Sequence, residues 1–81
     1  MKEQRMTAIE IATGAAIAAQ SAVNYARECN QVEQKYGVDG SRHLTYANAN
    51  AAVLEEAYEA MELAIKKLFQ VKDREARMLE L

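Results

Sequence analysis

Few side chains in this sequence could carry out chemistry, and three of them lie in one short segment. His43 is the single histidine of the 81 residues, and Asp39 and Ser41 lie within four positions of it. These residue types can form a Ser–His–Asp triad, but a triad needs members held by a rigid scaffold. Three residues so close together in one loop do not meet that need. We therefore expect no catalytic site, and we assign His43 a loop or helix-cap role.

The other reactive residue types also give no cofactor or metal site. The sequence contains no Glu-x-x-His pair of the kind used by di-metal bundles and no glycine-rich phosphate-binding motif. The four carboxylates between residues 55 and 62 are expected to form a solvated acidic surface. Cys29 lies in an apolar row, so we interpret it as a small buried hydrophobic residue, with a redox or inter-chain disulfide role as the alternative. The sequence thus predicts a protein that is not an enzyme and has no cofactor.

The composition excludes several protein classes. The chain is 51% hydrophobic but only 6% aromatic, with no Pro and three Gly, which does not suit a β fold. A single Cys excludes a disulfide scaffold and fits a reducing compartment. The uncharged run near the N-terminus is interrupted by Thr, Gln, Ser and Asn, so we expect no membrane span. These features predict a cytoplasmic protein.

Nucleic-acid binding is disfavoured by the charge of the chain. The formal net charge is −2 and the pI is about 5.4. A basic cluster between residues 66 and 77 is interrupted by acidic residues, and generic DNA-binding proteins are basic. We therefore expect the partner to be a protein.

The first 36 residues carry the spacing of a long helix, predicted over about 2–36. An unbroken apolar row with alternating steps of three and four predicts the seam against a second helix. This row consists of Ala8, Ile11, Ala15, Ala18, Ala22, Tyr25, Cys29, Val32 and Tyr36. The opposite, polar face is expected to be exposed, and it carries Glu10, Thr13, Gln20, Asn24, Arg27, Gln31 and Gln34.

A second helix is predicted over about 45–79, after a loop at 37–44. Gly37 is expected to end the first helix in a left-handed conformation, and either Ser41 or Thr45 could cap the second helix. Whether residues 41–51 form a separate short helix stays open. Because the loop is short, we expect one antiparallel hairpin domain over 1–81, in which position i meets roughly 80 − i. The fold class is therefore all-α, a two-helix hairpin.

A second apolar row on the first helix predicts self-association. A lone hairpin would leave this row in water, so we expect a homodimer that forms a four-helix bundle. The predicted self-association residues are Ile9, Ala12, Ala16, Ala19, Val23 and Ala26.

Without catalytic groups, the chain is interpreted as a small regulator or inhibitor that binds another protein, in the manner of phage or mobile-element accessory proteins that act on host machinery. The candidate partner-binding residues are Glu55, Glu59, Glu62, Lys72, Arg74, Arg77, Met78 and Leu79. One alternative is a structural, assembly or chaperone subunit. Another is an RNA-binding dimer that resembles the plasmid copy-number regulator Rop in architecture only, with no shared residue motif. The partner and the source organism stay open.

Overall fold

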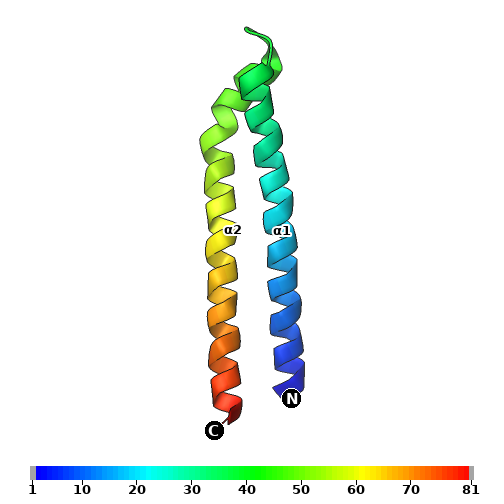
Figure 1. Ribbon diagram of the computed structural model, residues 1–81, viewed down its shortest axis with the longest axis vertical. Coiled ribbons are helices and arrows are strands. Elements are labelled where there is room, and N and C mark those ends of the chain that lie inside the picture. The colour runs from blue at the N-terminus through cyan, green and yellow to red at the C-terminus, as the bar shows by residue number, and fades with distance from the viewer. Residues whose placement is uncertain (1, 81) are drawn as a thin grey trace.

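The chain forms a long helical hairpin. A computed structural model describes residues 2–80, with side chains described for residues 4–78. Helix α1 spans Lys2–Tyr36 and helix α2 spans Arg42–Glu80, and the two run antiparallel, with both termini at one end (Figure 1). The principal extents are 62 × 16 × 13 Å. The predicted all-α hairpin is thus confirmed, and α1 has the predicted bounds.

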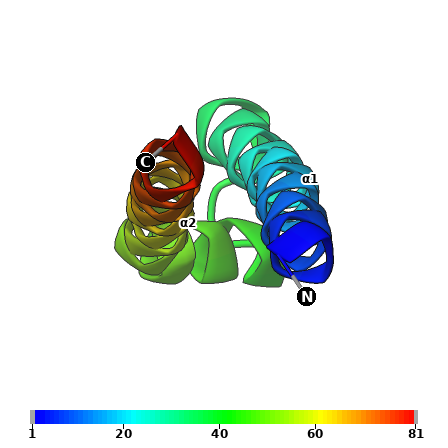
Figure 2. The ribbon, with the colours of Figure 1, turned by 90° about the horizontal axis from the view of Figure 1, so that it is seen from below.

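The turn between the helices is fixed by Ser41. The Leu44 backbone N–H donates to Ser41 Oγ at 3.1 Å, so Ser41, and not Thr45, caps α2, which begins three residues earlier than expected. Residues 42–51 therefore belong to α2, whose first turns are inclined to the rest of the helix (Figure 2).

The left-handed residue of the turn is Gly40, with a φ of +78°, and the expectation for Gly37 is wrong. The Gly37 N–H instead continues the helical pattern and donates to Glu33 O at 2.7 Å. Glycine is still required at position 37, because an added Cβ would lie 2.4 Å from that same carbonyl oxygen.

The two helices meet along heptad-spaced rows. Cross-helix polar contacts join Arg5 to Glu75, Arg27 to Glu55 and Gln34 to Asn48, so the numbers of paired residues sum to between 80 and 82. This register agrees with the expected pairing of i with roughly 80 − i. The inward row of α1 contains Met6, Ile9, Thr13, Ala16, Gln20, Val23, Arg27 and Asn30, and that of α2 contains Leu44, Ala47, Ala51, Leu54, Tyr58, Met61, Ile65, Leu68, Lys72 and Glu75, all buried or half-buried.

The face that α1 turns toward α2 differs from the prediction. All nine residues of the row from Ala8 to Tyr36 are exposed, so the prediction that this row packs against the second helix is wrong. Conversely, Thr13 is buried, and Gln20, Asn24 and Arg27, expected in solvent, are half-buried at the seam. The physical reason is that long polar side chains find partners across the seam, as the Arg27 contacts with Tyr58 and Glu55 show.

The hairpin buries little surface by itself. Among the described residues, only Ala47 and Thr13 are buried, at 4% and 6% exposure. The accessible surface is 6348 Å², whereas a compact protein of this mass exposes about 4,900 Å². The radius of gyration is 18.2 Å, against about 12 Å for a compact chain of this length. Each molecule therefore carries an unusually large free surface.

Candidate interaction surfaces

The most apolar free surface lies on α1. It consists of the nine exposed residues of the row that was predicted to pack against the second helix, and we name this row the outer stripe: Ala8, Ile11, Ala15, Ala18, Ala22, Tyr25, Cys29, Val32 and Tyr36. Ile11 is 67% exposed, Tyr25 71%, Val32 57% and Tyr36 72%. Alternating steps of three and four keep all nine residues on one side of the helix. The outer stripe therefore has the pattern of a helix-packing surface, and neither of the two helices described over residues 2–80 covers it.

Helix α2 carries a second apolar row, here named the outer row. It consists of Tyr46, Val53, Ala57, Ala60, Ala64, Val71 and Met78. Tyr46 is 56% exposed, Val53 60% and Met78 63%, while Ala57 and Ala64 are half-buried. Asn50, Lys67 and Arg74 interrupt this row, so it is less continuous than the outer stripe.

The outer stripe and the outer row meet only near the turn. A shallow groove of about 400 Å³ there is lined jointly by Cys29 of the stripe and Tyr46 of the row, with Ala26, Glu33 and His43. Residues two positions apart lie about 200° apart around a helix. The stripe residues Ile11, Ala18, Tyr25 and Val32 therefore lie opposite the seam residues Ile9, Ala16, Val23 and Asn30 and point away from α2. The outer stripe and the outer row are thus two separate apolar surfaces.

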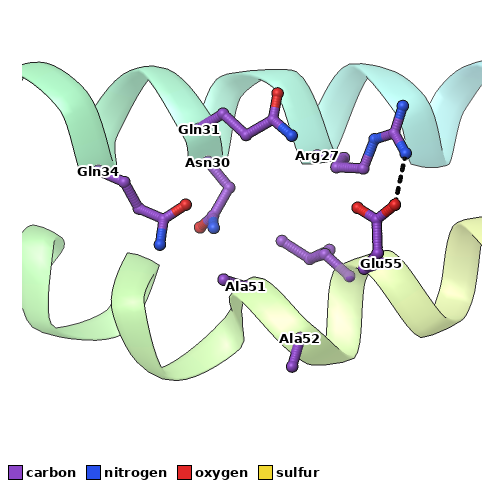
Figure 3. A pocket seen from close by; sticks show the side chains of 8 residues that line it. Arg27, Asn30, Gln31, Gln34, Ala51, Ala52 and Glu55 are labelled. Atoms are coloured by element: carbon purple, nitrogen blue, oxygen red, sulfur yellow. Dashed lines mark hydrogen bonds and ion pairs between the residues drawn. The ribbon is translucent and has the colours of Figure 1, made fainter.

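The opposite face is polar and centres on Arg27. A hollow of about 290 Å³ there is lined by Arg27, Asn30, Gln31, Gln34, Ala51, Ala52, Leu54 and Glu55 (Figure 3). Arg27 Nη1 donates to Glu55 Oε1 at 3.0 Å, and its Nη2 donates to Asn24 Oδ1 at 2.7 Å. The guanidinium also lies 3.9 Å from the centre of the Tyr58 ring. Arg27 therefore joins three side chains from both helices.

Arg27 lies at the seam, although the sequence pattern predicted that its side chain is exposed to solvent. Its side chain is 22% exposed, and its Nε is buried without a hydrogen-bond partner. Asn30, which the sequence pattern assigned to neither face, also lies at the seam, since its amide donates to the Ala47 carbonyl at 2.9 Å. The signal that could have found them is the seven-residue spacing of Met6, Thr13, Gln20 and Arg27, which mixes apolar and polar types.

The groove near the turn brings together Cys29 and His43, two residues considered for chemistry. His43 lies in the first turn of α2 and is exposed, and Cys29 is exposed on the outer stripe rather than buried. The expectation that Cys29 is a buried thiol in the hairpin seam is therefore wrong. Over residues 2–80, no group of three or more His, Cys, Asp and Glu side chains is arranged to hold a metal ion.

The structure divides the predicted self-association residues between two environments. Ile9, Ala16 and Val23 are half-buried in the seam with α2. Ala12, Ala19 and Ala26 are exposed beside the outer stripe. Only this second group is free to meet another chain, so the surface that can self-associate is centred on the outer stripe.

The predicted partner-binding residues are spread along α2. Glu59 and Glu62 are exposed, whereas Glu55 pairs with Arg27, and Lys72 is half-buried at the seam. Near the C-terminal end, Arg74 and Arg77 line a polar hollow of about 220 Å³ with Gln70 and Asp73. Met78 is exposed, and the side chain of Leu79 lies outside the described residues.

Comparison with known proteins gives no relative. No family model matches the chain, and no curated protein and no solved structure matches it.

One property of α1 departs from the sequence-based expectation of no membrane span. The segment Gln4–Tyr36 is long and apolar enough to cross a membrane by length and composition alone. Signal sequences and core helices of soluble proteins meet the same criterion, so this is weak evidence. Only 6% of the apolar window is buried within the chain, which again shows how open α1 is.

Proposed function

We propose that the chain is a small interaction protein without chemistry of its own, which self-associates through the outer stripe of α1 and binds another protein to regulate or inhibit it. The observation that carries the proposal is the exposure of large apolar side chains in two rows. Of twelve large hydrophobic residues exposed in the described part of the chain, four lie on the outer stripe and four on the outer row.

Burial arithmetic supports self-association. The chain exposes 6348 Å², about 1,500 Å² more than a compact protein of its mass. A standard interface removes about 800 Å² from each partner. A second copy on the outer stripe would therefore remove about half of this excess.

Helix α2 carries the proposed surface for a different protein. In a dimer closed through the outer stripes of α1, the exposed carboxylates Glu59 and Glu62 and the exposed cations Arg74 and Arg77 of α2 stay accessible. Charged rims of this kind steer association and select partners. No residue motif identifies the partner. The proposed accessory role in phage or mobile elements follows from how often small all-helical chains without catalytic groups have such a role.

We also propose a cytoplasmic location. If α1 crossed a membrane, the antiparallel α2 would lie beside it at the same depth. The exposed side chains of Glu59, Glu62 and Lys66 would then face lipid, where each charge costs about 2.5–3.5 kcal/mol.

Two measurements test the proposal. Light scattering at micromolar concentration should give a mass above the 9.0 kDa of one chain. Affinity capture from the producing cells should recover a partner that is lost with Glu59→Lys plus Glu62→Lys, or with Arg74→Glu plus Arg77→Glu. A monomer would exclude self-association. Capture that is unchanged by both double variants would exclude these α2 surfaces.

A further inference from the structure

We infer that the occupant of the outer stripe is a second copy arranged antiparallel, with α1 against α1 about a two-fold axis near Ala22. This inference rests on the proposed self-association and specifies its geometry. Two properties of the chain support it: the side-chain sizes along the outer stripe and the positions of charges beside it.

The outer stripe has small side chains in its N-terminal half and large side chains in its C-terminal half. Its first five residues are four alanines and Ile11, and its last four are Tyr25, Cys29, Val32 and Tyr36. In an antiparallel dimer, the half of each stripe that has small side chains lies along the half with large side chains in the other copy. Around Ala22, residues with numbers that sum to 43 or 44 then meet, so Ala8 faces Tyr36 and Ala18 faces Tyr25. Pairing small with large side chains fills space without voids.

Charges beside the outer stripe disfavour the parallel alternative. Glu28 and Glu33 flank the stripe on opposite sides, five residues apart. In a parallel helix pair, flanking residues with this spacing meet across the interface, so Glu28 would face Glu33 of the second copy twice. In the antiparallel pair, Glu28 faces Gly14 and Glu33 faces Ala12, so no like charges meet. The antiparallel arrangement thus removes two repulsions.

Disulfide cross-linking tests the arrangement in the full-length chain. Disulfides need Cα atoms within about 7 Å. In the antiparallel dimer, the two Cys29 residues are fourteen positions out of register, which corresponds to about 21 Å along the helix. We therefore expect wild-type Cys29 to form few inter-chain disulfides under mild oxidation. The variant Ala22→Cys with Cys29→Ser places the thiols at the axis and should cross-link at least tenfold faster. Ala18→Cys with Cys29→Ser is the control, because its thiols are seven positions out of register, about 10 Å along the helix, and should link slowly.

Light scattering and circular dichroism of the same samples separate the outcomes. The inference is supported by a mass of about 18 kDa, twice that of one chain, retained helicity and fast linkage at position 22 only. A dimer in which Cys29 and position 18 link as fast as position 22 is parallel, and overturns the inference while self-association stands. A dimer that links at none of the three positions uses another surface and also overturns the inference. A helical monomer overturns both the inference and the proposed self-association.

Discussion

Replacing Arg27 distinguishes packing from charge as the source of hairpin stability. Arg27 is the most connected side chain of the seam, with Glu55, Asn24 and Tyr58 as partners. Its aliphatic stem lies in the heptad row, while its Nε is buried without a partner. We compare Arg27→Ala, which removes stem and charge, with Arg27→Met, which removes the charge but keeps an apolar stem of similar length.

The magnitudes follow from these contacts. The hydrogen bond to Asn24 contributes about 1.5 kcal/mol, the contact with the Tyr58 ring about 1 kcal/mol, and the ion pair with the half-exposed Glu55 about 0.5 kcal/mol. Removing the unpartnered Nε returns about 1.5–2 kcal/mol. Loss of the stem costs about 1 kcal/mol. Arg27→Ala should therefore lower the free energy of unfolding by about 2 kcal/mol.

Arg27→Met should change the free energy of unfolding by less than about 1 kcal/mol, because Met keeps the stem and its sulfur can contact Tyr58. Urea unfolding followed by circular dichroism measures both variants, at one fixed protein concentration since association adds to stability. Glu55→Gln is the control, and it should cost no more than about 0.5 kcal/mol. If Arg27→Met is as unstable as Arg27→Ala, the charged contacts stabilise the seam and the reasoning is refuted.

Three further predictions concern the turn and the two faces of α1. Ser41→Ala should lower stability by about 1 kcal/mol, because it removes the cap of α2, and an unchanged urea midpoint would contradict that role. Gly40→Ala should lower stability by about 1 kcal/mol, since its φ is +78°; a variant as stable as wild type would show that the turn can relax. Ala16→Glu should destabilise the hairpin by about 2 kcal/mol, because it places a charge at the half-buried seam. Ala15→Glu, one residue away on the exposed outer stripe, should keep the fold and weaken dimerisation, as unfolding and light scattering on both variants would show; equal loss of stability would contradict the assignment of the faces.

The sequence predicts the elements of this fold better than their contacts. The unbroken spacing from Ala8 to Tyr36, and the turn residues near Gly40 and Ser41, predict two helices and a short connection, and the hairpin has both. The antiparallel register also follows. Because a short loop at the centre of the chain joins two helices of similar length, the helices can pair along their full lengths in one register only. These features depend on local spacing, which a single sequence contains.

The face by which α1 contacts α2 could not be predicted in this way. An alanine-rich helix carries two apolar rows, and the more continuous one was expected to form the seam. Gln20 and Arg27 were placed in solvent because they lie opposite the more continuous row, and Asn30 was assigned to neither face. The partners of Arg27 and Asn30 lie on the other helix: they are the Tyr58 ring and the Ala47 carbonyl. A polar side chain at a seam is recognisable only when the residue opposite is known.

The placement of the two rows bears on assembly. Within one chain, packing the outer stripe against α2 would remove Ile11, Tyr25 and Val32 from water, yet these three stay exposed while Gln20 and Arg27 occupy the seam. Burial at about 25 cal/mol per Å² favours covering the stripe. We propose that another molecule covers the stripe, since both rows are then buried. The face by which α1 packs on α2 is therefore coupled to the proposed dimer. Dissociating the dimer should also weaken the preference of α1 for the present seam.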